Sequence, residues 1–193
     1  MVTTTRRFTL AEYLAHDDFI EQRYELVNGE LIEMPAESDL NNAIAMYLIG
    51  VFIQAVPIRL LRRGTEVVVS GFRATSRVPD LMVLTEELAT ALVGSKRSIV
   101  MMDMPPPALV VEVVSPGKDS EDRDYRYKRS EYAARGIAEY WIVDPARAQV
   151  SILTLVDGLY EEATYQGDQR LLSQTFPKLE LTAEQVLQTG ELL

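Results

Sequence analysis

The sequence predicts an α/β fold in which a mixed sheet is flanked by helices and preceded by an N-terminal hairpin. Segments with helical spacing alternate with short strand-like runs, the order found when helices cover a sheet. The run from Ala108 to Val114 is apolar except at one position, as in strands buried on both faces. Because 47% of the 193 residues are hydrophobic, we expect one domain spanning residues 1–193, with a core that needs no disulfide.

The N-terminal segment predicts a short helix followed by a hairpin. Thr9 and Glu12 have the spacing of a capping box, so a helix is expected to run to about Asp17. The dipeptide Asn28-Gly29 separates two strand-like runs, YELV and ELIEM, and is a strong signal for a two-residue hairpin turn. We therefore expect two antiparallel strands in the register that this turn sets.

A long apolar helix is expected next. Ser38 and Asp39 offer its cap, and it should end near Pro57, or kink there and stop by Gly64. The uncharged stretch 40–58 is as long as a short membrane-spanning helix. Its two asparagines, its glutamine and its proline favour a core helix instead, because unpaired amides are costly in lipid.

The rest of the chain alternates strands with helices. In order, we expect strands at 65–70 and 78–84 around a loop at 71–76, a helix at 85–93, a strand at 108–115, a helix at 120–135 that stops at Gly136, a strand at 139–144, a hairpin of strands at 149–156 and 158–165 around Asp157-Gly158, and a tail helix at 182–188.

Composition restricts the chemistry. The chain has no Cys, which excludes disulfides and thiolate zinc sites, and its one histidine, His16, provides no histidine cluster for a metal. Catalysis would therefore rest on carboxylates, Lys, Tyr or Ser. The net charge of −10 repels nucleic acid at long range unless a basic patch or bound cations compensate. No apolar stretch of signal-peptide length follows the N-terminal arginines, so we expect a cytoplasmic protein.

Two carboxylates stand out. Glu112 interrupts the apolar run 108–114, where burial is costly unless a cation, a proton or hydrogen-bond donors compensate. Asp80 precedes the apolar run 81–84 and enters from a second core strand. Together they make the hard oxygen ligand set that suits magnesium or manganese. The alternatives are a structural ion pair for Glu112 and a turn cap for Asp80.

Four further residues could face these acids. In the expected hairpin register Glu25 opposes Ile32, so it shares an apolar face. The alternative is that Glu25 is a charge on an edge strand that prevents aggregation. Asp124, Lys128 and Tyr132 have i, i+4, i+8 spacing along one helix face. That face could be a solvent-exposed ladder of salt bridges, or it could direct the Lys128 ammonium toward the two strand carboxylates.

A family resemblance rests on six motifs in order: RYELVNGELIEMPAES, NNAI, RVPDLMVL, PPPALVVEVVSP, D-x-x-x-K-x-x-x-Y before GIAEYWIVDP, and FPKLEL. From Phe8 to Leu187 the chain resembles the Uma-type family of restriction endonucleases, a branch of the PD-(D/E)XK nuclease superfamily. The resemblance implies a restriction-endonuclease-like core, with a mixed sheet flanked by helices, and a divalent-metal phosphodiesterase site.

Carried over residue by residue, the resemblance assigns roles to four side chains. Asp80 and Glu112 resemble the two acids of the PD-(D/E)XK motif, Lys128 resembles the lysine that this branch carries on the next helix, and Glu25 resembles its N-terminal glutamate. Two departures are visible. Valine, Val114, stands where the superfamily usually has its lysine, and Asn41 stands where a histidine is often found in the family.

The resulting hypothesis is magnesium- or manganese-dependent hydrolysis of a phosphodiester, with DNA as the expected partner and no membrane. Asp80, Glu112 and the Val113 carbonyl would hold the metal, and Lys128 and Glu25 would complete the catalytic set. Asp124 and Tyr132 would hold the Lys128 side chain in place. Cutting both strands of a duplex would be simplest for a homodimer.

Two other functions are compatible with parts of the pattern. A nuclease-like fold without turnover could bind a protein or nucleic-acid partner, in keeping with the acidic balance and the lack of an evident basic face. Paired carboxylates also suit a glycosidase. However, the single tryptophan, Trp141, lies inside an apolar strand rather than on a sugar platform.

Overall fold

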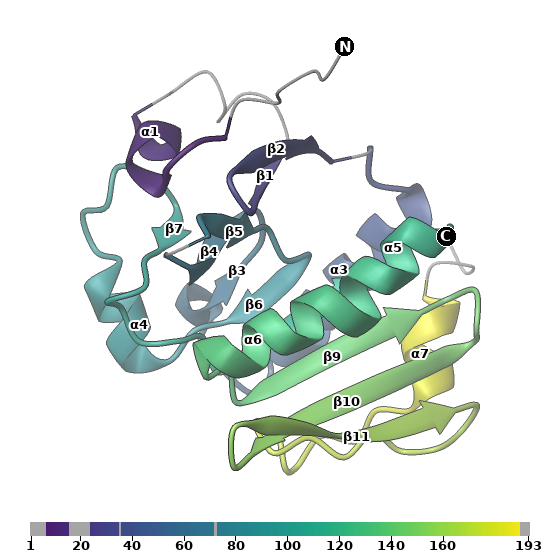
Figure 1. Cartoon of the computed structure of the whole chain (residues 1–193). Helices are drawn as coiled ribbons and strands as arrows, with labels where there is room; N and C mark the ends of the chain where they lie inside the picture. Colours follow the sequence, from purple (N-terminus) through teal and green to yellow (C-terminus); the bar gives the residue numbers. More distant parts are fainter. Residues whose placement is uncertain (1–6, 16–23, 35, 72, 190–193) are drawn as a thin grey trace.

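The structure is a computed structural model, and it describes residues 7–15, 24–34, 36–71 and 73–189. These residues form two mixed sheets with helices on their faces (Figure 1). The strands are β1 Tyr24–Val27, β2 Glu30–Glu33, β3 Leu61–Arg62, β4 Glu66–Ser70, β5 Thr75–Arg77, β6 Leu81–Val83, β7 Ile99–Val100, β8 Leu109–Val113, β9 Glu139–Asp144, β10 Gln149–Val156 and β11 Leu159–Gln166.

The helical segments follow the predicted order. The α-helices are α1 Leu10–Leu14, α3 Asp39–Phe52, α4 Glu86–Ala91, α5 Lys118–Asp122, α6 Arg129–Arg135 and α7 Ala183–Gln188. A 3-10 turn, η1 Ile58–Leu60, follows α3, and a π-helical segment, η2 Arg123–Lys128, joins α5 to α6. No helix of the described residues is long and apolar enough to cross a membrane.

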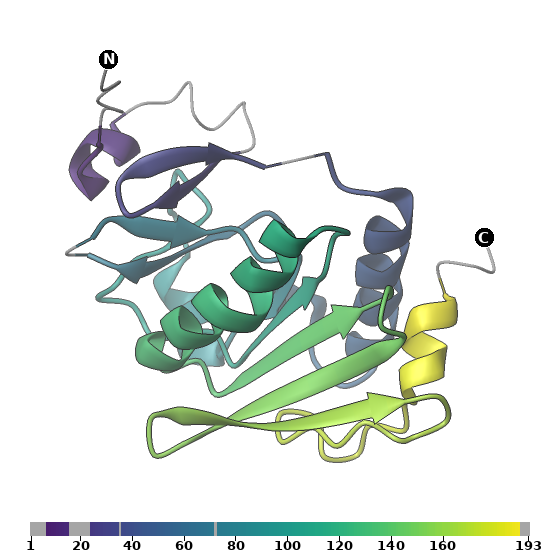
Figure 2. The same ribbon diagram turned by 45° about the vertical axis from the view of Figure 1, so that its right-hand side comes forward.

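The larger sheet has the order β11-β10-β9-β8-β6-β3, with β8 and β9 parallel and the other pairs antiparallel. The smaller sheet has the order β2-β1-β5-β4-β7. The α5–η2–α6 helix crosses one face of the larger sheet, and α3 and α7 lie on the other (Figures 1 and 2). The fold class is confirmed, with the N-terminal hairpin now belonging to a second sheet.

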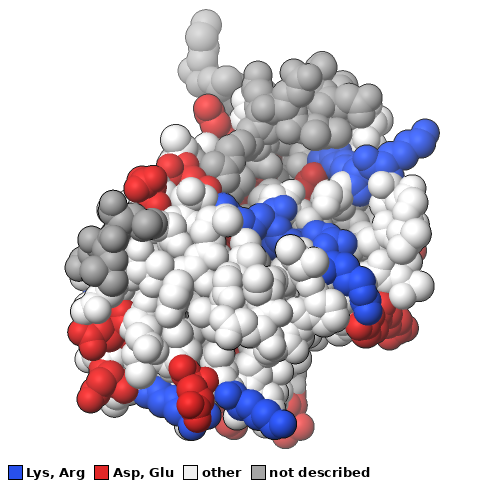
Figure 3. Space-filling model, turned by 180° about the vertical axis from the view of Figure 1, so that it is seen from behind, with Lys and Arg blue, Asp and Glu red and all other residues white. Residues whose placement is uncertain are grey.

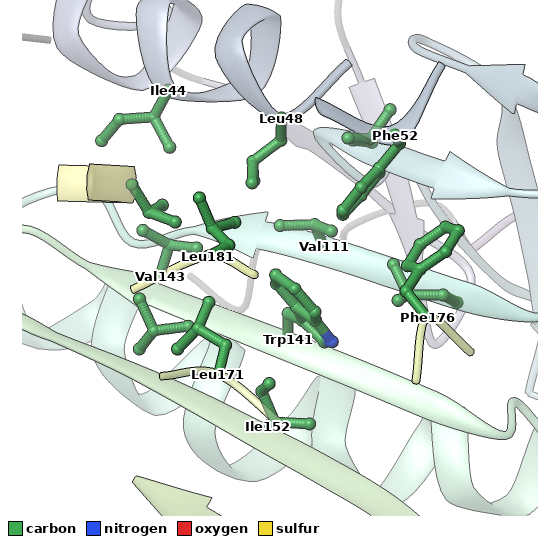
Figure 4. Packing of buried hydrophobic residues seen from close by; sticks show 14 of the residues in the cluster. Ile44, Leu48, Phe52, Val111, Trp141, Val143, Ile152, Leu171, Phe176 and Leu181 are labelled. Atoms are coloured by element: carbon green, nitrogen blue, oxygen red, sulfur yellow. The ribbon is translucent and has the colours of Figure 1, made fainter. Parts of the chain in front are cut away.

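The main core lies between α3 and the larger sheet. Figure 4 shows Ile44, Leu48 and Phe52 of α3 pointing toward Trp141 and its neighbours on the strands. The Phe52 ring meets the Trp141 ring edge-on at 5.6 Å between centroids and stacks on Phe176 at 4.6 Å. Burying each such side chain stabilises the fold by about 1.5–3 kcal/mol. This packing holds the sheet that carries the candidate site.

The two faces of β8 are filled by alternate residues. Val111 and Val113 pack in the α3 core, whereas Val110 and Val114 belong to a second apolar cluster under α6. Glu112 lies between the last two, and strand alternation turns its side chain toward η2 and α6. The uninterrupted apolar neighbours explain why a carboxylate at this position is buried.

Local signals at the N-terminus are confirmed where the structure describes them. The capping box of Thr9 and Glu12 is present, and the hairpin pairs Leu26 with Leu31 across the predicted turn. Gly29 takes a φ of 83°, in the left-handed region that glycine adopts without strain. The end of the first predicted helix, including His16, lies outside the described residues.

Several boundaries differ from the expectation, and the strand expected at 78–84 is shorter, as β6 Leu81–Val83. The long helix has the predicted Ser38 cap but ends at Phe52, and the chain leaves Pro57 in a 3-10 turn. The predicted loop at 71–76 is wrong in part, because β5 begins at Thr75 and pairs with both β4 and β1. A three-residue strand is too short to show a period in the sequence.

Charge is unevenly spread over the surface. The view from behind shows Lys and Arg side chains in a band beside a broad uncharged area, with Asp and Glu mainly toward the margins (Figure 3). A chain with a net charge of −10 therefore still gathers basic side chains on part of this face.

Candidate active site

Asp80, which directly precedes β6, lies beside Glu112 of the neighbouring strand β8. The antiparallel register pairs Leu81 with Val111, and its continuation places Asp80 opposite Glu112. The Val113 backbone N–H donates to Asp80 Oδ2 at 2.7 Å, which orients the carboxylate. Both acids line one cavity of about 30 Å³, enough for a water or an ion.

Lys128 reaches this cavity from the helix. Its Nζ lies 2.7 Å from Glu112 Oε2, 3.1 Å from Asp124 Oδ1 and 3.8 Å from Glu25 Oε1. Asp124 and Lys128 both belong to η2, whose π-helical turn is a feature often found at functional sites. The structure thus brings the strand acids and the helix ammonium together, and Asp124 contacts Lys128 as expected.

Tyr132 also points into this group, but its contact differs from the expectation. Its hydroxyl donates to Glu112 Oε1 at 2.7 Å rather than holding Lys128. Both oxygens of Glu112 therefore have a partner, one an ammonium and one a phenol. Burial, reinforced by the Glu112 charge, raises the pKa of Tyr132 well above 10, so the hydroxyl stays protonated and keeps donating.

Glu25 is held in place by Arg77 of β5. The Arg77 guanidinium donates to Glu25 Oε2 at 2.8 Å and forks onto both oxygens of Glu131 at 2.7 and 2.9 Å. The Val78 N–H donates to Glu25 Oε1. Glu25 is therefore a buried, paired carboxylate rather than an exposed edge charge.

The group carries more negative than positive charge. Burial raises the pKa of Glu112 to about 8, and Asp80 and Asp124 add to this rise against the Lys128 ammonium. Burial also raises the pKa of Asp80 despite its backbone hydrogen bond. Burial alone would lower the pKa of Lys128, but Asp124, Glu112 and Glu25 outweigh it and raise that pKa, so the ammonium is retained.

The donor set fits a hard divalent cation. Mg²⁺ is commonly held by one or two carboxylates together with water and substrate phosphate, and Asp80 and Glu112 supply two. Among the described residues no group of three or more Asp, Glu, His or Cys is arranged as a metal site. The Val113 carbonyl, an expected ligand, accepts a hydrogen bond from Asn41 Nδ2 at 3.1 Å and has one further lone pair.

Several polar residues around the cavity were not predicted. Arg77 pairs with acids 52 and 54 positions away, a separation that leaves no local pattern. Glu37, Ser115 and Arg123 line the cavity from loops and helix ends. Glu37 belongs to the PAES end of the first motif, and Arg123 directly precedes Asp124 of the D-x-x-x-K spacing. These positions are the one sequence signal that could have marked the two residues.

A larger cavity, of about 690 Å³, lies apart from this group, between α3, α7 and the 175–181 segment. Its lining is mostly apolar and includes Tyr47, Val51 and Phe176, with Lys178 and Glu180 as its charged members. It brings no carboxylate pair together, so its size does not make it the better candidate for hydrolytic chemistry.

Comparisons with known proteins agree with the motif resemblance. The model of the Uma2 family, described as "Putative restriction endonuclease", matches residues 10–184. A protein of Synechocystis, described as "Uncharacterized protein sll1609", is 27% identical over 133 residues, which cover 66% of this chain and 70% of that protein. A crystal structure from Anabaena variabilis, described as a "putative nuclease belonging to DUF820", has a TM-score of 0.74 and 19% identity, and the match covers 95% of this chain and 99% of that one. The structural likeness confirms the fold.

Proposed function

The chain belongs to the Uma2 family, and on this premise we propose that it is a divalent-metal-dependent nuclease that hydrolyses phosphodiester bonds in DNA. Magnesium or manganese is the proposed cofactor. The observation that carries the proposal is the convergence of Asp80, Glu112 and Lys128 on one small buried cavity. The acids come from two strands and the ammonium from the following helix, which is the arrangement that the family motifs imply.

Asp80 and Glu112 would hold the cation, with the Val113 carbonyl as a third oxygen. A bound cation would supply Lewis-acid polarisation of a phosphoryl oxygen and a lowered pKa for a coordinated water. The remaining roles belong to the chain itself. Lys128 keeps its proton and offers N–H donors to negative charge that develops on the phosphate. Asp124 and Glu25 both lie within 4 Å of its Nζ, at 3.1 and 3.8 Å.

Two groups fix the acids for this task. Tyr132 donates to Glu112 Oε1, and the Val113 N–H donates to Asp80 Oδ2, so each carboxylate keeps one defined orientation. Arg77 fixes Glu25 in the same way. Orientation of this kind reduces the reorganisation that the site needs when substrate arrives.

The test is a nuclease assay with magnesium or manganese on duplex DNA. The wild type should cleave, and Asp80→Asn, Glu112→Gln and Lys128→Met should each lose about a hundredfold or more in rate. Glu86→Gln, an exposed glutamate paired with Arg59 away from the cavity, serves as the matched control and should cleave like wild type. Equal activity in all five proteins would place the cleavage outside this site.

A second candidate is a nuclease fold that binds a partner without turnover. The observation that favours it is that each oxygen of Glu112 already has a protein partner, Lys128 on one and Tyr132 on the other. Thermal unfolding with millimolar magnesium or manganese separates the two. A stabilisation that depends on Glu112 supports the enzyme, whereas no shift, with a neutral Glu112→Gln, supports the binding module.

A further inference from the structure

A second, more open cavity adjoins the candidate site. It has a volume of about 250 Å³ and shares Glu37 and Asp80 with the smaller cavity. Its other lining residues are Arg63, Gly64, Val78 and Pro79. Asp80 thus forms part of the wall of both, so a molecule in the open cavity lies next to the group that would hold the metal.

Arg63 is the cationic residue of this cavity. Its Nε donates to the Asp80 backbone carbonyl at 3.1 Å, one terminal nitrogen donates to Asn42 Oδ1 at 2.6 Å, and the other pairs with Glu37. A guanidinium has five N–H groups, and these contacts to described residues use three. The Arg63 side chain is 26% exposed, so its remaining donors can reach a ligand in the cavity.

We propose that Arg63 binds a substrate phosphate next to the scissile one, in the open cavity beside Asp80, and that Glu37 neutralises its guanidinium until the substrate arrives. The proposal rests on the nuclease function proposed above and assigns to it a substrate-binding residue that the family motifs do not name. Arginine suits this role because its planar fork matches two phosphate oxygens at once.

The charge of the site supports an exchange of partners. The carboxylates around the small cavity and the net charge of −10 repel a polyanion, so a cation at the entrance is needed to hold the strand. Glu37 reaches Arg63 from the loop before α3, and the Glu37 side chain is itself 17% exposed. A phosphate would then take the place of the Glu37 carboxylate beside the Arg63 guanidinium.

The test measures binding of a fluorescein-labelled mixed-sequence DNA duplex in EDTA, where a metal-dependent enzyme cannot cleave. Arg63→Gln should weaken binding about eightfold at 0.1 M salt and reduce the slope of log affinity against log salt by about 0.9, as expected for one lost phosphate contact. Glu37→Gln should strengthen binding, because the competing carboxylate is gone. Arg63→Lys should keep the wild-type salt slope.

The exposed pair Arg59–Glu86 provides the matched control. Arg59→Gln and Glu86→Gln should bind the duplex like wild type. An Arg63→Gln protein with wild-type affinity and salt slope would overturn the inference, as would weaker binding by Glu37→Gln or no binding by wild type. If Arg63→Gln fails to fold, the Glu37→Gln and Arg63→Lys results decide.

The same proteins in magnesium separate this inference from the proposed function. Arg63-dependent binding without cleavage by wild type would leave the phosphate site standing and remove the nuclease. Cleavage that depends on Asp80 and Glu112, together with DNA binding that does not depend on Arg63, would support the nuclease and remove the phosphate site.

Discussion

Replacing Glu112 with glutamine should remove a loss of stability that the metal-free protein suffers as pH rises from 5 to 8. Burial among other acids raises the pKa of the Glu112 carboxyl to about 8, from a value of 4.5 in the unfolded chain. Between these values the folded protein binds a proton that the unfolded chain has released. The free energy of unfolding therefore falls as pH rises, and the contribution is fully present below about 4.5 and lost above about 8.

The size of the effect follows from the two pKa values. They differ by about 3.5 units, and at ~1.4 kcal/mol per unit the loss has an upper limit on the order of 5 kcal/mol. Asp80, whose pKa burial also raises, adds a slope of the same sign in both proteins. Lys128 keeps its proton throughout, because the surrounding carboxylates raise its pKa. The difference in slope between wild type and variant therefore measures Glu112 together with its coupling to Asp80.

The assay is urea unfolding in EDTA at pH 5, 6, 7 and 8, followed by the fluorescence of the single, buried Trp141. The slope is the criterion rather than the offset, because a glutamine amide facing Lys128 costs some stability at every pH. The exposed Glu86→Gln variant should run parallel to wild type in this range. A Glu112→Gln curve that also falls with pH like the wild-type curve would show that Glu112 does not cause the pH dependence.

Three further outcomes are expected. Magnesium at 10 mM should stabilise the wild type by about 1.4 kcal/mol if its dissociation constant is about 1 mM, and Asp80→Asn should abolish this gain; calorimetry checks both. Arg77→Met leaves Glu25 buried without its guanidinium and should cost about 3–5 kcal/mol in urea unfolding, whereas Arg59→Met on the surface should leave the midpoint unchanged. Gly158 has a φ of 84° and open space around a new Cβ, so Gly158→Ala should cost about 1–2 kcal/mol of stability. Gly29→Ala should cost more, because its Cβ would lie 2.9 Å from the Phe8 carbonyl oxygen. Equal losses of the two variants in thermal unfolding would contradict this.

Local chemistry made much of the fold predictable. The Asn28-Gly29 turn set the register that places Glu25 on an inner face, and the Ser38 cap marked the start of α3. Glu112 was recognisable because burying a charge within an apolar run carries a large desolvation cost. The i, i+4 spacing of Asp124 and Lys128 predicted their common direction, and both side chains are buried.

Features that depend on distant partners were not predictable. The strands β3, β5 and β7 have two or three residues each, which is too short for any period. Arg77 looks like a surface charge in the sequence, and only the fold brings it to Glu25 and Glu131. The π-helical turn of η2 likewise has no sequence signal in a charged stretch that reads as an ordinary helix.

Two buried carboxylates on neighbouring strands show that the crowding of acids around Glu112 is not a requirement of the fold. Glu139 on β9 is fully buried, yet three neutral donors, Trp141 Nε1, the Ser173 hydroxyl and the Thr175 N–H, satisfy its oxygens. Glu112 on β8 instead shares one ammonium with two other carboxylates, an arrangement that apolar residues of similar volume would often replace at no cost in stability. A divalent cation would relieve the excess charge at the cavity that Glu112 shares with Asp80, so the arrangement that weakens the metal-free protein would be stabilised by the metal that we propose.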